Sequence, residues 1–421
     1  MSGIARIHKN NTVLKIYILG IVLKLVISPW ATGDFIASWG IATSYVCDAI
    51  LLSVVFIQFS RFPKGYLPIF IVFVFTALTY TFSTFLFTDE SMISGLTNHI
   101  KTFLPILLIP TAVSLAAHTD MSMEKIVYGI CLVGITLVII ALATFPPSMN
   151  RMVPWMPTYF GGLHTTAYVS LIIMYCIHAL WSFKYLSTIK AVPIMIALTY
   201  LIMFGWGVRT ASIGAVIFFA GISTRYFTFY DRPLLSLVFP LALAMPLSVL
   251  PMLDFAGAVD DMSSGRISMY IEKYHQLSRN TVTAWFIGNG YLSDLILTDV
   301  WWWAPKGAHS DFITFLVEGG IFYLGGFFYC IRTLMKMHEN LPEKLIVAAI
   351  LSTSMFSNGV FARPIAAYLL SLVFVIYYCQ KSKNNNLPET DPRKIKRQRE
   401  LQLQAVKMPK RDREKKQERL T

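Results

Sequence analysis

Long apolar runs recur along nearly the whole chain and restrict it to one kind of fold. Of 421 residues, 55% are hydrophobic and only 14% are charged, and the aromatic residues include 30 Phe and 20 Tyr. This composition is too apolar for a single soluble core, so the sequence predicts a polytopic membrane protein. Unpaired backbone groups are costly in lipid and the runs are too long for barrel strands, so we expect an all-α fold.

About twelve of these runs are long enough to be transmembrane helices. They are residues 13–30, 35–60, 66–87, 99–117, 125–145, 163–182, 190–207, 210–223, 234–250, 309–331, 345–359 and 362–379. The predicted organisation is nine helices in residues 1–250, a large loop at 251–308, three helices in 309–379 and a basic tail at 380–421. The first run ends in Pro29-Trp30 rather than in small residues, so we expect it to remain as a helix and not to be cleaved as a signal peptide.

The distribution of positive charge predicts the orientation of the helices. With both termini in the cytoplasm, the cytoplasmic segments other than the tail carry 12 Lys and Arg residues, against 7 on the opposite side. Four of those seven lie in the large loop, so the short outer loops are nearly free of positive charge, as the positive-inside rule requires. We therefore expect the loop at 251–308 to lie outside the cytoplasmic membrane.

The tail is the most basic part of the chain. Residues 380–421 hold 14 Lys and Arg against 6 Asp and Glu, which gives a net charge of +8 out of +13 for the whole chain. Such a segment beside a membrane helix predicts an interaction with anionic lipid. The tail lacks interleaved aromatic residues, so we do not expect nucleic acid as a partner.

The large loop contains one segment with helical periodicity, GRISMYIEKYHQLSR at 265–279. Four apolar residues recur in it near helical spacing: Ile267, Tyr270, Ile271 and Tyr274. The charged residues, Lys273 among them, fall on other faces, so we expect an amphipathic helix that lies on the outer leaflet. Trp301 to Trp303 predict an aromatic anchor at the membrane interface.

Ionisable residues gather at the outer ends of the predicted helices. Arg209 lies between the seventh and eighth helices, and Arg363 lies between the eleventh and twelfth. Arg266 begins the amphipathic segment, and His309 heads the tenth helix. Guanidinium groups match phosphate oxygens with two parallel hydrogen bonds, so three arginines at one level favour a diphosphate ligand. The alternative is that each arginine anchors a helix end by reaching to the lipid headgroups.

The tenth helix opens with the polar stretch GAHSDF and carries a carboxylate deeper in. A neutral His309 imidazole could act as a general base, cap the helix or donate to a phosphate. Glu318 lies nine residues later, about 13 Å along a helix, so it cannot share a proton with His309. We interpret Glu318 as a buried structural partner of an arginine or of polar groups between helices, with adjacent glycines allowing close helix approach. Asp48 has no partner that the sequence identifies.

No sequence pattern predicts a metal, a cofactor or a nucleotide. The eight histidines are dispersed, and no phosphate-binding Gly-Lys-Ser/Thr loop occurs. The five cysteines lack metal or redox spacing, so we interpret them as packing residues: Cys47, Cys131, Cys176, Cys330 and Cys379. A reaction on the outer face would therefore use a substrate that is already activated.

Four motifs, taken in order, resemble the O-antigen ligase and Wzy-type O-antigen polymerase superfamily. They are VRTAS around Arg209, SGR at 264–266 followed by Tyr270, FIGNG at 286–290, and HSDFITFLVEGGIFYLGG from His309. The resemblance extends from about residue 160 to residue 380, with a similar number of helices and the same large late loop. It implies a membrane fold of the GT-C-like type.

The resemblance also implies an activity and roles for the clustered residues. Members of this superfamily are metal-independent, inverting glycosyltransferases of the bacterial inner membrane, with a periplasmic active site. They take a glycan from undecaprenyl diphosphate and pass it to an acceptor hydroxyl. By this resemblance Arg209 and Arg266, with Arg363 as a looser match, would bind the diphosphate, and His309 would position or deprotonate the acceptor. The candidate supporting residues are Tyr270, Asp311 and Glu318.

Three hypotheses for the function follow from the sequence: a polymerase, a ligase and a flippase. The combination of SGR, FIGNG and HSDF favours a polymerase that extends O-antigen or another surface polysaccharide, with a chain-length regulator as a candidate partner. A ligase would instead transfer the glycan to the lipid A core. A polysaccharide flippase would place ionisable residues along a path open to both sides. Here they gather at one face without an internal repeat, so the sequence favours a transferase over a flippase or a purely structural protein.

Overall fold

A computed structural model describes residues 2–27, 34–150, 153–223, 266–298, 302–338 and 340–386. The predicted helix at 234–250, the side chain of Arg266, Trp301 and the tail beyond Asn386 lie outside what is described. The contacts divide the chain after Tyr377, so residues 378–421 form a second unit, of which the end of the last helix is described.

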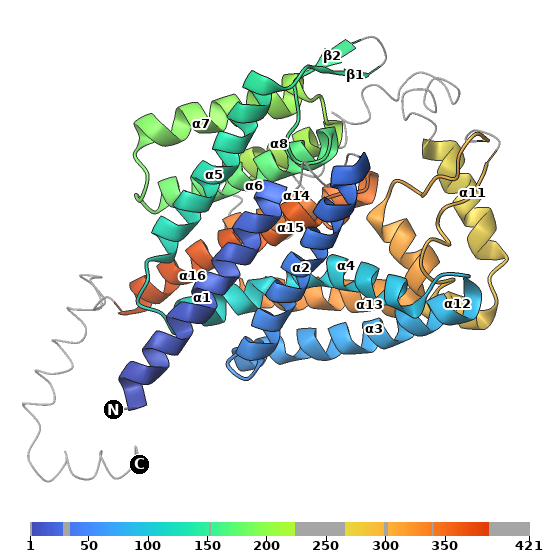
Figure 1. The fold of residues 1–421 in the computed structure, drawn as a ribbon, viewed down its shortest axis with the longest axis horizontal. Helices are drawn as coiled ribbons and strands as arrows, with labels where there is room; N and C mark the ends of the chain where they lie inside the picture. The colour runs from blue at the N-terminus through green and yellow to red at the C-terminus, as the bar shows by residue number, and fades with distance from the viewer. Residues whose placement is uncertain are drawn as a thin grey trace, which may run out of the picture. The chain divides into compact units, whose positions relative to one another are not determined.

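Long apolar helices make up the first part of the chain (Figure 1). They are α1 (Ser2–Ile27), α2 (Asp34–Phe59), α3 (Leu67–Phe87), α4 (Met92–Ala117), α5 (Met123–Thr144) and α6 (Leu163–Ser182). The short turn η2 (Lys64–Tyr66) precedes α3, and a hairpin of β1 (Ser148–Asn150) and β2 (Val153–Trp155) separates α5 from α6.

The second part of the chain adds helices of more varied length. They are α7 (Thr188–Tyr200), continued by the π-helical turn η3 (Leu201–Gly205), α8 (Arg209–Ser223), α11 (Arg266–Ser278), α12 (Val282–Ile287), α13 (Asp311–Met337), α14 (Leu341–Phe356), α15 (Pro364–Tyr368) and α16 (Leu370–Asn386). A helix therefore occupies eleven of the twelve predicted segments, and the remaining segment, 234–250, lies outside the described residues.

Eight helices in the described ranges are long and apolar enough to cross a membrane. They lie in α2, α3, α4, α5, α6, α7 with η3, α13, and α15 with α16. The exposed side of α3 is formed by large apolar residues: Leu67, Ile71, Val74, Phe75, Leu78, Phe82, Phe85, Leu86 and Phe87. Water would not favour such a surface but lipid does, so the predicted class of helical membrane protein is confirmed at this level.

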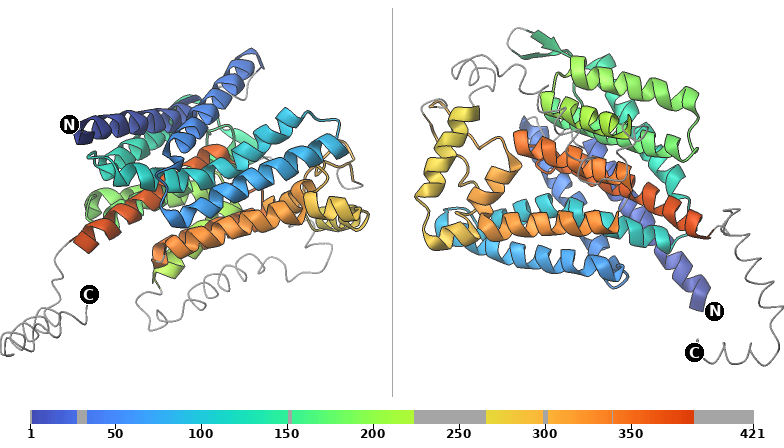
Figure 2. Two further views of the ribbon diagram at one scale, coloured as in Figure 1. Left: turned by 90° about the horizontal axis from the view of Figure 1, so that it is seen from below. Right: turned by 180° about the vertical axis from the view of Figure 1, so that it is seen from behind.

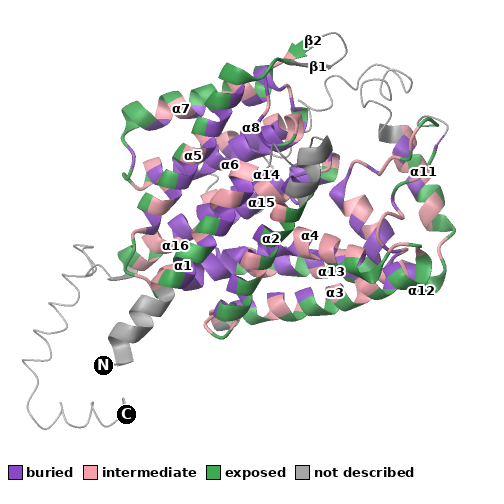
Figure 3. Cartoon of the chain, in the orientation of Figure 1, coloured by how far each residue is buried: buried purple, intermediate pink, exposed green. Residues whose placement is uncertain are grey.

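The interior of the first unit is built around α4 and α6, which are buried along most of their length, whereas α3 and α7 are exposed along one side (Figure 3). Pro105 and Pro110 lie inside α4, where neighbouring helices surround the backbone groups that a proline leaves unpaired. Four of the five cysteines are buried and all five are free thiols. Their predicted role as packing residues therefore agrees with their placement.

The helix α13 lies beside α3 and α4, and α12 lies against α13 near Gly320 (Figures 1 and 2). A Cβ atom on Gly326 would lie 2.8 Å from the side chain of Thr76 and 2.9 Å from that of Val72, both on α3. Gly325 instead has open space around its Cα. The close helix approach predicted for this glycine-rich stretch is thus confirmed at Gly326 but not at Gly325.

Candidate functional site

His309 occupies an unusual backbone position directly before α13. Its φ angle is +51°, in the left-handed region that non-glycine residues adopt infrequently. Ser310 follows in an extended conformation as the N-cap of α13, and its carbonyl accepts a hydrogen bond from Thr314 at 3.0 Å. Backbone conformations of this kind persist only where neighbouring contacts hold them, and they concentrate at functional sites.

Asp294 supplies the contacts that hold this turn. Its Oδ2 atom accepts hydrogen bonds from the Ala308 amide at 2.9 Å and from the Thr314 hydroxyl at 2.7 Å. The carboxylate therefore joins the residue before His309 to the first turn of α13. A Cβ atom on Gly307 would lie 2.7 Å from the same oxygen, so the close approach of the loop depends on that glycine.

The charge of Asp294 is balanced by Lys273 of α11. The Lys273 amine lies 2.9 Å from Asp294 Oδ1, also donates to the Asp294 carbonyl, and is only 1% exposed. Burial lowers the pKa of Lys273, although the carboxylate opposes this effect by favouring the charged amine. The pair anchors α11 to the loop that carries His309.

The helix α11 is amphipathic, as expected. Ile271 and Tyr274 are exposed, at 52% and 70%, which agrees with a face that rests on lipid. Lys273 lies on a different face from these two residues, as expected, and is buried together with Met269. Its partner carboxylate, Asp294, lies 21 residues away, beyond what helical periodicity can reveal.

Asp311 attaches the start of α13 to the segment between α14 and α15. Both of its carboxylate oxygens accept the Gly359 amide at 3.1 Å, and the Ser310 hydroxyl donates to the Ser354 carbonyl at 3.4 Å. Arg363 is the N-cap residue of α15 and interacts electrostatically with buried Asp311. The structure therefore brings together the segments that carry His309 and Arg363.

Tyr168 of α6 connects this region to α8. Its buried hydroxyl lies 2.7 Å from the Thr210 hydroxyl, and Tyr168 interacts electrostatically with both Asp311 and Arg363. Thr210 directly follows Arg209, whose side chain is exposed at the start of α8. The beginnings of α8, α13 and α15 thus converge around Tyr168, a residue that no sequence motif singles out.

One nitrogen of the Arg363 guanidinium is unsatisfied. The Nε atom is buried and has no hydrogen-bond partner among the residues that the structure describes, while the side chain as a whole is half-buried. A buried donor without a partner costs free energy unless a ligand satisfies it. This feature suits an acceptor-rich anion such as a phosphate.

Arg266 and Tyr270 lie on α11, which contacts α13. Arg266 begins the helix, but its side chain lies outside the described residues. Tyr270 is half-buried, one turn before Lys273. The structure thus places these two predicted site residues on the helix that Asp294 holds beside the His309 loop.

Glu318 has a structural role in the structure, as predicted, but its partners are not arginines. Tyr80 of α3 donates to Glu318 Oε2 at 2.5 Å, and the Leu292 amide donates to Oε1 at 3.0 Å. Asn98 of α4 in turn donates to the Tyr80 hydroxyl at 2.9 Å. The carboxylate therefore joins α3 and α13 to the loop after α12.

The FIGNG and EGG motifs pack directly against each other. The amides of Asn289 and Gly290 donate to the carbonyls of Val317 and Glu318 at 2.8 and 2.9 Å. Gly320 has a φ angle of +69° and breaks the helical conformation within α13, so the loop can approach. A Cβ atom on Gly288 would lie 2.1 Å from the Glu318 carbonyl. These glycines therefore set the position of the loop that leads to Asp294.

Asp48, for which the sequence identified no partner, pairs with Lys24. The Lys24 amine lies 2.6 Å from Asp48 Oδ1 and also donates to the Ser44 hydroxyl at 2.6 Å. The Tyr368 hydroxyl donates to the same Asp48 oxygen at 2.6 Å. This buried network joins α1, α2 and α15, the helix whose N-cap residue is Arg363.

In the described part of the chain, no group of three or more His, Cys, Asp or Glu side chains is arranged to hold a metal ion. The segment that carries His309 meets the segments that carry Arg363 and Arg209. Guanidinium and imidazole groups can bind an anion and transfer a proton.

Comparison with known proteins adds no family. No protein-family model matches the chain, and no curated protein sequence matches it.

Proposed function

We propose that this protein is a membrane glycosyltransferase that moves a glycan from undecaprenyl diphosphate to an acceptor sugar hydroxyl. One observation carries the proposal: at the start of α13, the segment of His309 meets that of Arg363, whose buried Nε atom has no partner among the described residues. Asp294 holds the adjoining turn through the Ala308 amide. A proton acceptor and an unsatisfied guanidinium on adjoining segments suit a reaction with a phosphate leaving group.

In this proposal the arginines bind the diphosphate. The bond between the anomeric carbon and the diphosphate oxygen breaks, and its electron pair leaves with the diphosphate. Arg209, Arg266 and Arg363 stabilise the developing negative charge, which is the usual contribution of preorganised donors. The diphosphate itself supplies the energy, so neither a nucleotide nor a metal is required in this scheme.

His309 acts on the acceptor. Its neutral imidazole takes the proton of the acceptor hydroxyl while that oxygen bonds to the anomeric carbon from the face opposite the diphosphate. The anomeric centre is inverted, and the imidazolium later releases the proton to water. Asp294 and Asp311 fix the backbone on both sides of His309, and this positions the imidazole for the step.

The proposed setting is the bacterial inner membrane, with both termini cytoplasmic and the site periplasmic. About twelve helices would cross the membrane, the loop at 251–308 would cover the outer face, and the tail would contact anionic lipid. The exposed Ile271 and Tyr274 of α11 support a loop that rests on the leaflet. The polyprenyl chain would then lie in lipid and the glycan in the periplasm.

The proposed acceptor is a second lipid-linked glycan, which makes the protein a polymerase of O-antigen or another surface polysaccharide. The test is complementation of a gene-deletion strain with His309→Ala, Arg209→Ala or Arg363→Ala, at matched protein levels. Matched controls are His275→Ala and Arg279→Ala, which alter exposed residues of the same types at the end of α11.

Gel analysis of the surface polysaccharide then gives distinguishable outcomes. Loss of the ladder in the three site variants, with a residual band of core plus one repeat and normal ladders in both controls, is the expected result. Long lipid-linked chains that fail to reach lipid A would identify a ligase instead. Normal ladders in all variants would reject the transferase and favour a flippase.

A further inference from the structure

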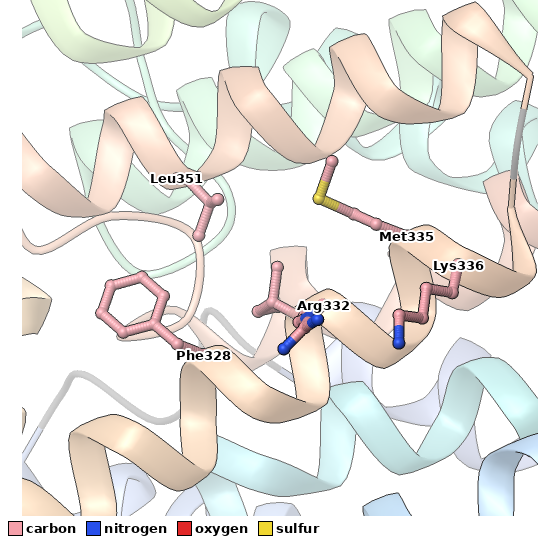
Figure 4. A pocket seen from close by; sticks show the side chains of 6 residues that line it. Phe328, Arg332, Met335, Lys336 and Leu351 are labelled. Carbon is pink, nitrogen blue, oxygen red and sulfur yellow. The ribbon is translucent and has the colours of Figure 1, made fainter. Parts of the chain in front are cut away.

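A groove lies between the second half of α13 and α14 (Figure 4). It has a volume of about 390 Å³ and is lined by Phe328, Ile331, Arg332, Met335 and Lys336 of α13 and by Leu351 of α14. Its walls are mainly apolar. Gly320 breaks the helical conformation within α13, and the groove lies along the part after this break, residues 321–337, which is about 25 Å long.

Two cations lie at one end of the groove. Arg332 and Lys336 are one turn apart on α13, and both side chains are exposed. Neither forms a hydrogen bond or an ion pair within the described ranges. The nearest acidic residue on α14, Glu343, is buried and engaged by His338 at 2.6 Å and by Asn340. The positive charge of the groove is therefore not balanced by the described protein.

The apolar wall continues along α13 away from Lys336. Phe328 lies eight residues before Lys336, roughly 12 Å farther along the helix. Leu351 of α14 lines the same groove, and the exposed apolar surface continues through Tyr329 of α13 and Met355, which lies one turn after Leu351. The groove thus has a cationic end and an apolar end, roughly 12 Å apart along α13.

From this arrangement we infer that the groove binds an anionic phospholipid. The phosphate of the headgroup lies between Arg332 and Lys336, and one acyl chain lies along Phe328 and Leu351. Charge complementarity selects an anionic headgroup, because two unpaired cations attract it and a zwitterionic lipid offers less net charge. Neither Arg332 nor Lys336 takes part in the proposed transferase chemistry, so the inference does not rest on the proposed function.

The first test is lipid-dependent stability of the purified full-length protein in a neutral detergent. Phosphatidylglycerol is expected to raise the Tm in a saturable manner, and phosphatidylcholine and inorganic phosphate are expected to do so weakly or not at all. The Arg332→Gln/Lys336→Gln variant is expected to bind phosphatidylglycerol about thirtyfold more weakly, from about 1 kcal/mol for each cation. Equal protection of this variant and the wild type would overturn the inference.

A matched control removes the same charge elsewhere. Lys125→Gln/Lys190→Gln alters two exposed lysines at the starts of α5 and α7. This variant is expected to keep the affinity of the wild type for phosphatidylglycerol. If it loses affinity to the same degree as Arg332→Gln/Lys336→Gln, the effect reflects net charge rather than a site, and the inference fails.

The second test identifies what occupies the groove. A photo-reactive benzoylphenylalanine in place of Leu351, irradiated in membranes, is expected to give a protein adduct with the mass of one phospholipid. The same residue in place of exposed Ile196 of α7, a general lipid-facing position, is expected to show no preference for anionic lipid. A cross-link from position 351 to another segment of the chain, such as residues 234–250, would mean that protein fills the groove and would overturn the inference.

Discussion

Asp294 accepts a hydrogen bond from the backbone amide of Ala308 at 2.9 Å, and this contact fixes the residue directly before His309. The same carboxylate is paired with Lys273 at 2.9 Å and accepts the Thr314 hydroxyl at 2.7 Å. One buried side chain therefore joins α11, the loop and α13. In the proposed mechanism it is a positioning residue, because its contacts act on the backbone around His309 and not on the substrate.

This relationship predicts that Asp294→Ala loses both stability and glycan transfer. Removing the carboxylate leaves the Lys273 amine buried without its partner, a change that costs about 3 kcal/mol or more. The double variant Lys273→Met/Asp294→Leu removes both charges and is expected to recover most of the stability. Unfolding of the purified proteins, followed by tryptophan fluorescence or by retention on a sizing column after heating, measures the stability of the single and the double variant.

Glycan transfer separates positioning from folding in these variants. The double variant is expected to be stable but to lack the polysaccharide ladder, because nothing then holds the Ala308 amide. Thr314→Val, which keeps the ion pair and removes one hydrogen bond to Asp294, is expected to cost about 1 kcal/mol and to reduce transfer less. A normal ladder from the stable double variant would show that Asp294 only supports the fold.

The glycines of the FIGNG and EGG contact predict a sharp positional difference. Gly288→Ala places a Cβ atom 2.1 Å from the Glu318 carbonyl, at a residue whose φ angle is +80°. We expect the free energy of unfolding to fall by about 2 kcal/mol or more, and the amount of membrane-inserted protein to fall with it. Gly325→Ala is the matched control, because nothing lies within 4 Å of its Cβ position. It should be neutral or slightly stabilising, since alanine favours the helix.

Equal expression and equal thermal stability of Gly288→Ala and Gly325→Ala would contradict the packing described for the loop. Loss of both would point to a general intolerance of α13 and its surroundings, and would remove the argument for a specific contact between Gly288 and Glu318.

The ion pair of Lys24 and Asp48 predicts a non-additive stability effect. Lys24→Met leaves the Asp48 carboxylate buried, with the Tyr368 hydroxyl as its remaining donor among the described side chains. We therefore expect the free energy of unfolding to fall by about 3 to 5 kcal/mol, as for other broken buried ion pairs. Lys24→Met/Asp48→Leu should recover a large part of it. Thermal unfolding of the four members of the cycle gives the coupling free energy.

Additive losses in this cycle would show that the two side chains stabilise the helices separately. Glycan transfer is expected to follow stability in all four proteins, because the hydrogen-bond partners of the pair are Ser44 and Tyr368, which have no role in the proposed reaction. A stable variant without transfer would give this network a functional role that the present arrangement does not assign.

Hydropathy was sufficient to predict where the helices lie, because a long apolar run is a local property of the chain. The predicted run at 163–182 has the same bounds as α6, and the run at 66–87 begins one residue before α3. Similarly, the recurrence of apolar residues near helical spacing predicted α11 as an amphipathic helix. What these patterns report is the period of a single segment.

The partners of the ionisable residues could not be predicted in the same way. Lys273 and Asp294 are 21 residues apart, and Tyr80 and Glu318 are 238 residues apart. Their pairing depends on how helices pack, which periodicity does not contain. For the same reason the sequence singled out His309 by its chemistry but overlooked Asp294, whose only sequence signal is a lone carboxylate in the apolar stretch YLSDLIL.

The most direct test is transfer by purified protein. Membranes from a gene-deletion strain, which should accumulate the lipid-linked repeat, are mixed with wild-type, His309→Ala or His275→Ala protein, and released undecaprenyl diphosphate is measured together with glycan length. With wild-type and His275→Ala protein, we expect undecaprenyl diphosphate to be released in proportion to the growth of the glycan. With folded His309→Ala protein, we expect neither release nor growth. Failure of the wild type to release undecaprenyl diphosphate, or equal release by His309→Ala, would contradict the proposed glycosyltransferase.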